Sequence, residues 1–410
     1  MSEIAFEALY GALETTNGTP VDPTHRLVMS GKIVPEAPRV AVAERRGVLA
    51  ARHRSVNTKR MSQLSAEGNL DAVTFPLLGN MGIAPVSSPS TPGGASTARL
   101  WTFTRVMAAK TLKTLTAYDG DPNVQSFRAA YMLAKELKVT SDATGEDPCK
   151  QSATMTGAFP VSSGIPTAVT AANPGVVTSI GHGLKNGDTV TFHDVVGMTE
   201  LNGNSYTVAS ATANAFTLSS TDTSAFTAFV YDADAYWTYD GPSAPSDVVG
   251  GLFVPADMQL WLDDTSTSHG TTEVTATILK AELTIPTGQQ EKIYPSGPGG
   301  GRTVNGHGVG EASPSLAWTL RFDNTNQYRL FKEGVKRRIR VRLNGEVIET
   351  VSGTVFYDYV QWDMTGYLET PSWEDFATTN RAIGFTTVGE YDSGLGSDLK
   401  LYVQNNRASL

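Results

Sequence analysis

The side chains best suited to catalysis or metal binding are scattered along this sequence. None of the six histidines lies at the HxxxH or HExxH spacing that lets one helix face hold a zinc ion. His182 and His307 each stand between two glycines, a setting typical of turns and loops. No GxSxG motif is present, and no nucleophile has a recognisable base and orienting residue. We therefore expect no catalytic residue, no cofactor, no metal and no enzyme activity.

Two segments begin like loops that bind phosphate or calcium, but each departs from its pattern. Residues 297–310 are glycine-rich yet lack the GxxxxGK[ST] motif, and Arg302 is not placed to serve as its lysine. Residues 119–123 open like a calcium loop, but Val124 stands where glycine is needed and Ala130 where glutamate is needed. We interpret the glycine-rich segment as a hairpin loop, because glycines let one backbone approach another closely.

Positive charge is concentrated in a stretch that ends at residue 60. Because no aromatic residue is interleaved there, stacking on nucleic-acid bases is not expected. A second basic series, Arg338, Arg340 and Arg342, alternates along an expected strand and so lies on one face of it. Glu346 and Glu349 are available as cross-strand partners for this series. The first stretch contains Arg45, Arg46, Arg52, Arg54, Lys59 and Arg60.

The composition favours a folded, β-rich protein that does not grip nucleic acid. Hydrophobic residues make up 40% of the chain and charged residues 18%, and glycines and prolines are scattered as turn residues would be. The net charge of −9 argues against binding through DNA phosphates, although a weakly acidic wall would let DNA slide past. Cys149 is the single cysteine, so no internal disulfide is expected. Without a signal-peptide pattern or an apolar run of ~20 residues, we expect a soluble chain made in a cytoplasm, with no membrane contact.

Hydrophobic periodicity divides the chain into three blocks, expected as domains at 1–161, 162–231 and 232–410. We expect a mainly β fold with one short helix in each outer block. In the first block the pattern predicts strands at 25–35, 65–70, 100–106, 112–118 and 151–161 and a helix at 71–81. Residues 126–140 fit both the helical and the strand period, and a strand is favoured for much of this range. In the last block it predicts strands at 258–262, 274–285, 316–322, 355–364 and 399–404 and a helix at 326–336. The strongest turn signal is Asn344-Gly345, which predicts a hairpin between 338–343 and 346–350.

The two outer blocks share an order of elements, as one fold written twice would. Each has a strand that ends near a proline, Pro35 in the first block and Pro286 in the last. Each continues with a long loop without periodicity, then a strand, a short helix and several alternating strands. We therefore expect an internal repeat.

This order, with a few residue patterns, resembles the major tail tube proteins of long, flexible-tailed bacteriophages. The patterns are Ala66-Glu67-Gly68-Asn69-Leu70, Leu77-Leu78-Gly79-Asn80-Met81-Gly82, Met155-Thr156-Gly157-Ala158-Phe159 and Lys280-Ala281-Glu282-Leu283-Thr284-Ile285-Pro286-Thr287-Gly288. The resemblance covers the first and last blocks. It implies two tail-tube-like β-sandwich or barrel domains and a structural virion protein of a siphovirus, with no catalytic role.

The middle block is different in composition, since Lys185 is its only lysine or arginine. Short β-forming runs separated by Asn-Gly turns at 186–187 and 202–203 predict a small all-β module. Its residue order resembles the module first described in ubiquitin-activating enzymes, which often decorates the outside of phage tail proteins. The segments that carry this resemblance are Asn173-Pro174-Gly175-Val176-Val177-Thr178, Gly181-His182-Gly183-Leu184, Gly187-Asp188-Thr189-Val190 and Leu201-Asn202-Gly203. Because the block has no cysteine, we expect no ubiquitin chemistry from it.

Tail tubes of this family are stacked rings in which neighbouring sheets pair edge to edge into one β-barrel. A chain with two such folds is expected to form a pseudo-sixfold ring from three copies, and ring closure would remove exposed strand edges. About four strands from each of six folds, spaced ~4.8 Å and tilted ~40°, enclose roughly 150 Å, or a barrel roughly 48 Å across. The resemblance implies self-association, contacts with a tape measure protein and with tail terminator or tip proteins, and double-stranded DNA in the lumen without specific binding.

Within such a tube, the basic stretch and the glycine-rich loop are the expected contacts between rings or subunits, with a solvent-exposed face as the other interpretation. These contact candidates are Arg45, Arg46, Arg52, Arg54, Lys59, Arg60, Arg302 and His307. The alternative function is a virion adhesin or baseplate protein with a carbohydrate-binding β-module. Exposed aromatic residues clustered on the middle block would favour that alternative.

Overall fold

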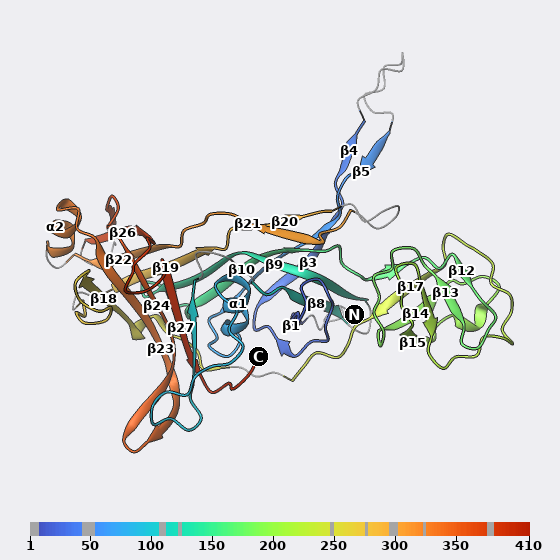
Figure 1. Cartoon of the computed structure of the whole chain (residues 1–410), viewed down its shortest axis with the longest axis horizontal. Helices are drawn as coiled ribbons and strands as arrows, with labels where there is room; N and C mark the ends of the chain where they lie inside the picture. The colour runs from blue at the N-terminus through green and yellow to red at the C-terminus, as the bar shows by residue number, and fades with distance from the viewer. Residues whose placement is uncertain are drawn as a thin grey trace, which may run out of the picture.

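The chain folds into a mainly β structure with two short helices in the part that the computed structural model describes (Figure 1). No helix in that part is long and apolar enough to cross a membrane. The described residues are 8–42, 54–105, 112–121, 125–246, 250–274, 278–294, 302–322, 325–374 and 381–410.

The elements follow in three groups along the chain. The first group is β1 (Tyr10–Leu13), β2 (His25–Arg26), β3 (Ser30–Glu36), β4 (Arg39–Ala41), β5 (Ser55–Asn57), β6 (Met61–Asn69), α1 (Phe75–Gly82), β7 (Arg99–Thr104), β8 (Leu115–Asp121), β9 (Gln125–Asp142) and β10 (Lys150–Gly157). The middle group is β11 (Ser163–Gly164), β12 (Ala168–Val169), β13 (Val176–Thr178), β14 (Thr189–His193), β15 (Ser205–Ala209), β16 (Ala215–Leu218) and β17 (Tyr236–Asp240). The last group is β18 (Met258–Asp264), β19 (Ile278–Pro286), β20 (Gln289–Lys292), β21 (Gly306–Val309), β22 (Ser315–Arg321), α2 (Asn326–Lys332), β23 (Arg337–Val351), β24 (Thr354–Gly366), β25 (Ser372–Glu374), β26 (Ala382–Val388) and β27 (Leu399–Asn405).

An eleven-stranded sheet joins the first and last groups. Within it, the series β3-β6-β10-β9 continues directly into β19-β22-β26-β25, because β9 pairs antiparallel with β19. The sequence forms this junction because both strands alternate apolar and polar residues, and the apolar set lies on one face. Leu137 and Val139 on β9 and Leu283 and Ile285 on β19 are fully buried there. The two groups therefore share one core.

The strands of the first and last groups pair in the same order. In the first group β1 pairs with β8, β8 with β9, β9 with β10, β10 with β6 and β6 with β3. In the last group β18 pairs with β23, β23 with β24, β26 with β22 and β22 with β19. The short strand β25 pairs with β26 in the position that the second half of β9 takes beside β10. Each group also has its helix directly after the corresponding strand, β6 or β22.

The last group forms a second sheet with help from the first. Its order is β18-β23-β24-β27-β7, so a strand of the first group closes one end. Trp101 on β7 and Trp362 on β24 are fully buried in the core between the layers. This exchange means that neither group completes its sheets alone.

The hairpin predicted at Asn344-Gly345 is wrong. β23 runs through both residues, and the pairing register with β24 shifts after Asn344, which marks a bulge. The chain instead reverses at Ser352 and Gly353, whose φ angles of 49° and 82° are those that a tight hairpin turn requires. The continuing ladder between β23 and β24 outweighs the local turn preference, and neither Asn344 nor Gly345 is among the residues with the positive φ that such a turn needs.

We predict that Gly353→Ala destabilises the fold by about 1 kcal/mol, because φ of +82° is a conformation that L side chains avoid. A methyl group at this position would touch nothing within 4 Å, so strain alone sets the loss. Urea denaturation would measure it. Gly93→Ala is the matched control, since its methyl group also meets open space but its φ is not left-handed. Equal midpoints for the two variants would contradict this turn assignment.

Candidate assembly surfaces

The two long loops that carry the predicted contact residues lie against each other. The Arg60 N–H donates to the Arg302 carbonyl at 2.6 Å, and the Arg302 guanidinium donates to the Asn57 carbonyl at 2.5 Å. The Phe159 N–H donates to the Thr303 hydroxyl at 2.7 Å. The segment after β5 and the segment before β21 therefore form one layer, although they are far apart in the sequence.

The other predicted contact residues divide by position. Arg54 and Lys59 are exposed beside β5. His307, on β21, shares a hydrogen bond of 3.0 Å with the Tyr131 hydroxyl, and burial lowers the pKa of its ring. A neutral ring at this place holds the β20–β21 hairpin against the first group. Arg45, Arg46 and Arg52 lie outside the described residues.

The β20–β21 hairpin packs against the first group, whereas the β4–β5 hairpin stands away from the body of the molecule. The Gln289 amide is buried and donates to the carbonyls of Met81 at 2.8 Å and Ala134 at 3.2 Å. By contrast, Val40 and Val56 on the β4–β5 hairpin are 51% and 39% exposed. Figure 1 shows β4 and β5 standing clear of the body. Within the described part of the chain, the β4–β5 hairpin thus lacks buried contacts like those that hold the β20–β21 hairpin.

The middle module is fastened to the first group by a buried ion pair. The Arg128 guanidinium on β9 donates to both Asp188 carboxylate oxygens, at 2.7 and 2.6 Å, and both side chains are almost fully buried. Tyr10 and Tyr118, stacked at 5.4 Å, belong to the same apolar core as the buried Trp237 of the module. Buried contacts therefore hold the module at one end of the molecule (Figure 1), so that it is not joined by a linker alone.

The module sheet extends beyond Tyr231, the end that the sequence suggested. β17 pairs with β14 and β11, so 236–240 belong to the sheet of the module. A deletion that stops at Tyr231 would leave this strand behind and would strip Asp188 from Arg128.

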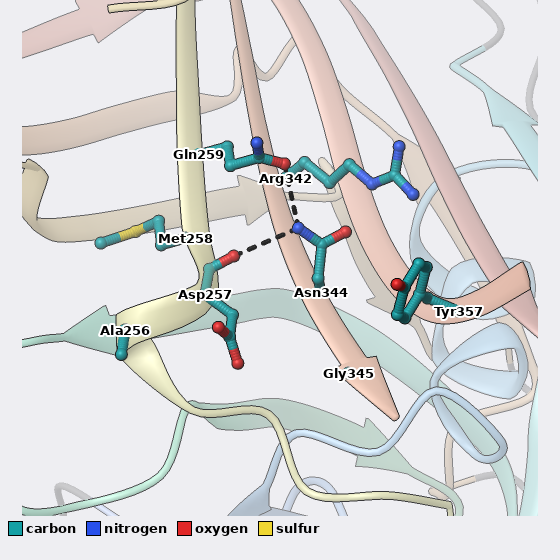
Figure 2. A pocket seen from close by; sticks show the side chains of 8 residues that line it. All are labelled: Ala256, Asp257, Met258, Gln259, Arg342, Asn344, Gly345 and Tyr357. Atoms are coloured by element: carbon teal, nitrogen blue, oxygen red, sulfur yellow. Dashed lines mark hydrogen bonds between the residues drawn. The ribbon is translucent and has the colours of Figure 1, made fainter. Parts of the chain in front are cut away.

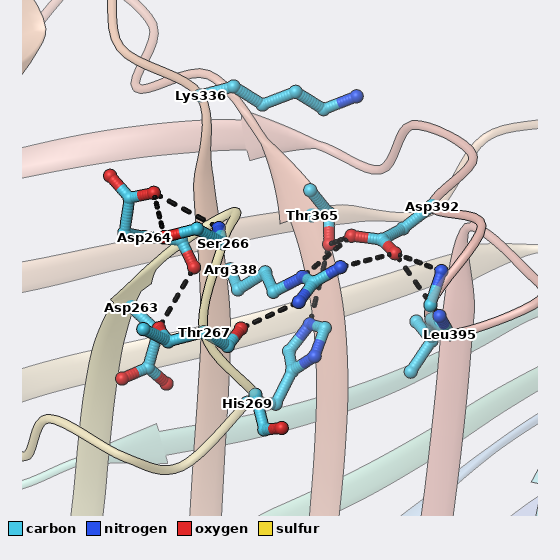
Figure 3. A network of polar contacts seen from close by, with 12 residues as sticks. Asp263, Asp264, Ser266, Thr267, His269, Lys336, Arg338, Thr365, Asp392 and Leu395 are labelled. Carbon is cyan, nitrogen blue, oxygen red and sulfur yellow. Dashed lines mark hydrogen bonds and ion pairs between the residues drawn. The ribbon is translucent and has the colours of Figure 1, made fainter.

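The arginine series of β23 is balanced inside the fold. Arg340 pairs with Asp363, directly opposite on β24, at 2.7 Å, and Arg342 lies over the Tyr359 ring at 4.0 Å. Figure 3 shows Arg338 between the Thr267 carbonyl and the Asp392 carboxylate. The pKa of Asp392 is held well below its usual range, chiefly by the Arg338 hydrogen bonds. Arg338 and Arg340 thus pair with carboxylates inside the fold, whereas Arg342 packs on an aromatic ring.

The expected partners Glu346 and Glu349 play other parts. Glu349 accepts the backbone N–H groups of Ser96, Thr97 and Ala98, and so ties the β23–β24 hairpin to the segment before β7. The hydrogen bond from the Ser96 hydroxyl, together with those from these backbone N–H groups, holds the pKa of Glu349 at about 2.

A pocket of about 600 Å³ opens where β18, β23 and β24 meet (Figure 2). The Asn344 amide crosses its floor and donates to the Asp257 carbonyl at 3.3 Å and the Gln259 side-chain oxygen at 3.0 Å. Arg342 also lines it, and burial lowers the pKa of that guanidinium. The lining has no nucleophile with a base beside it. Nor does the described part of the chain contain a cluster of His, Cys, Asp and Glu that could hold a metal ion.

A small acidic cluster lies beside this pocket. Burial, with smaller contributions from the carboxylates of Asp71 and Glu346, raises the pKa of Asp358 to about 6 against the opposing hydrogen bond from the Gly251 N–H. At neutral pH this carboxylate is mostly ionised, and holding its charge in the folded state costs stability.

Comparisons with known proteins concern the middle module. Residues 172–232 match the family model of the ubiquitin-activating enzyme E1 FCCH domain. The chain is 40% identical over 72 residues to the ubiquitin-like modifier-activating enzyme 1 of Oryctolagus cuniculus. That stretch covers 17% of this chain and 6% of the relative. The predicted resemblance of the middle block is confirmed, and the similarity carries no further than a small part of either protein.

Sequence reasoning missed the residues that join the parts. Arg128 and Asp188 lie in blocks that read as separate, and the segment Gly187-Asp188-Thr189-Val190 gives no sign that Asp188 has a partner outside the module. The one available signal was a charged residue, Arg128, amid apolar neighbours in a strand, since such a charge needs a buried partner.

We predict that Arg128→Ala destabilises the fold by about 3–5 kcal/mol, because it leaves the Asp188 carboxylate buried without its cation. Denaturation followed by tryptophan fluorescence would measure this, since Trp237 lies in the same core as the module. The control is Asp22→Asn, which removes an ion pair to Lys185 whose carboxylate is 75% exposed and should cost under about 1 kcal/mol. Comparable losses would show that the Arg128 pair does not fasten the module.

We predict that Asp358→Asn stabilises the fold at pH 7.5 by up to about 3 kcal/mol, because the folded-state pKa of about 6 lies above the unfolded value. For such a group, wild-type stability is greatest below the unfolded pKa and falls as pH rises through 6. The gain should therefore disappear near pH 4. Thermal denaturation across this range would test it. Asp264→Asn, at an exposed carboxylate whose pKa is lowered by hydrogen bonds from Ser266, should give no gain at any pH.

Proposed function

We propose that the chain is a structural subunit of the tail tube of a long-tailed bacteriophage, whose copies close into stacked rings through which the genome passes. The observation that carries this proposal is the shared pairing order of the first and last groups, joined within one chain by β9 and β19. A repeat that already joins its own copy edge to edge has the geometry that ring assembly needs.

The number of strands supports three copies in each ring. The series from β3 to β25 contributes eight strands, four from each group. Three copies would supply 24 strands, which at ~4.8 Å spacing and ~40° tilt enclose roughly 150 Å. A barrel of that size, roughly 48 Å across, leaves room for duplex DNA inside.

The outward face of this series has the chemistry of a channel wall. The charges at the β9–β19 junction pair across the strands. Lys138 lies 2.7 Å from Glu282, and Lys280 lies 3.4 Å from Asp142. Because the cations are matched by carboxylates, this face would offer DNA little to hold, as passage through a lumen requires.

In this proposal the protein has no catalytic role and acts in the virion. The tape measure protein and the tail terminator or tip proteins are further proposed partners. The module, set at one end of the molecule, would lie on the outside of the tube (Figure 1).

One observation favours the adhesin or baseplate alternative. Tyr236 on β17 is 38% exposed and stacks on His193 with ring centroids 4.8 Å apart, and Tyr231 is 59% exposed. Flat exposed rings of this kind suit contact with a sugar face. They are compatible with a decoration on a tube as well as with an adhesin.

The purified chain should polymerise into hollow tubes, which negative-stain microscopy would show as stacked rings roughly 48 Å across at the barrel backbone. A monomer or compact trimer that never stacks would count against the tube. Glycan binding by such a species, lost in Tyr236→Ala and kept in the wild type, would select the alternative.

A further inference from the structure

We propose that the outer edge of β3 in one copy pairs antiparallel with the outer edge of β25 in the next, with Val34 opposite Ser372. This inference rests on the proposed function and adds which edges meet and in what register. The occupant of each edge is a second copy of this chain.

β3 and β25 are the two ends of the eight-strand series. In the described part of the chain, β3 pairs with β6 and β25 pairs with β26, and neither has a strand on its other side. Open edges of this kind attract other strands and are normally covered or blunted. β3 and β25 lie at opposite ends of the same series, so the β3 edge of one copy can pair with the β25 edge of the next.

The β3 edge is blunted in the single chain. The Ile33 N–H donates to the Asp119 carboxylate at 2.8 Å instead of to a strand, and Pro35 has no N–H to offer. The Asp119 oxygen stands where a backbone carbonyl of a partner strand would accept the same N–H. This hydrogen bond protects the β3 edge from pairing with unrelated strands until the matching edge of another copy replaces it.

The β9–β19 junction is a template for this contact. β19 corresponds to β3, because it pairs with β22 as β3 pairs with β6, and each strand leads into a hairpin that begins at residue 289 or 39. β25 corresponds to the second half of β9, because it pairs with β26 as β9 pairs with β10. The pairing of β19 with β9 therefore has a counterpart, β3 with β25, that a single chain leaves unmade.

The pairing ladders within each group transfer the register of the β9–β19 contact to the proposed β3–β25 contact. Matching the two hairpin starts aligns Thr284 with Val34. The ladders between the corresponding strands then align Lys138 on β9 with Ser372 on β25. Three steps give this alignment, each matching a pair in the first group with the equivalent pair in the last group. They are Ser30↔Glu67 and Lys280↔Thr319, then Lys150↔Asn69 and Ala382↔Arg321, then Lys138↔Ser152 and Ser372↔Gly384. Because Thr284 opposes Lys138 in the template, Val34 opposes Ser372.

Trp373 is the side chain that this contact would cover. It pairs with the buried Ile383 and so belongs to the core-facing side of β25, yet it is 42% exposed. Its counterpart in the template, Val139, is fully buried opposite Leu283. The ring stacks edge-on against Phe322 at 5.1 Å, which holds it in place. A rigid, half-exposed tryptophan beside an open edge is typical of the anchor of a protein interface.

In the same arrangement, the β4–β5 hairpin would pack against a neighbouring copy. Its counterpart, the β20–β21 hairpin, lies on the first group through Gln289. Carried by the same correspondence, β4–β5 would lie on the last group of the next copy and cover Val40 and Val56, which are exposed in the single chain. One set of relations thus accounts for both the open edges and the exposed hairpin.

Disulfide trapping tests the register. The double variant Val34→Cys with Ser372→Cys should form a disulfide between copies under mild oxidation, because directly opposed residues lie within disulfide reach. Lys32→Cys with Ser372→Cys is the matched control, since it uses the same face but is offset by two residues. We expect about tenfold more covalent multimer from the first pair on non-reducing gels. The native Cys149 is fully buried and does not compete.

The outcomes separate this inference from the proposed function. Tubes that form while the two double variants cross-link equally, or not at all, would overturn the register and leave the tube intact. A wild-type chain that never assembles would overturn the function and this inference with it. Multimers that end at a covalent trimer would support both and would give three copies for each ring.

Discussion

The need to satisfy strand edges shapes this molecule. β9 is long enough to meet this need on both sides, since it pairs with β8, β10 and β19. Its contact with β19 turns two similarly ordered groups of strands into one sheet and one core. The exchange of β7 into the second sheet adds to this union. Because backbone hydrogen bonds and apolar burial cross the junction together, the two groups are expected to fold and unfold as one cooperative unit.

The same requirement places the module. An insertion between β10 and β18 must leave and re-enter the sheet without disturbing it, and the chain does so at one end of the molecule. The buried pair between Arg128 and Asp188 then fixes its orientation. The net contribution of such a pair to stability is small compared with the cost of removing one partner, since desolvation offsets much of the attraction. A module with a fixed orientation can present the same surface on every copy of an assembly.

Local patterns predicted the class of fold and most elements. The alternation in 316–322 identified β22, and a strand was favoured for much of 126–140, where both periods fit and where β9 lies. The two helices lie within or near the predicted ranges. The Asn344-Gly345 turn failed because a long ladder overrode a two-residue preference. The basic stretch was predicted as a contact surface, and the structure places Arg60 beside Arg302 within the chain. That proximity could not be read from the sequence, because it depends on how two distant hairpins cross the same sheet.

The sequence alone determined the β class and the relationship of the middle module, since these depend on alternation, turn residues and residue order over short spans. Tertiary structure decided which edges are joined within the chain and which stay open. It also decided that Trp373 is exposed while Val139 is covered. The physical reason is that edge pairing is a long-range backbone contact. Any alternating strand could in principle pair with any other, and only the shared core selects the partners.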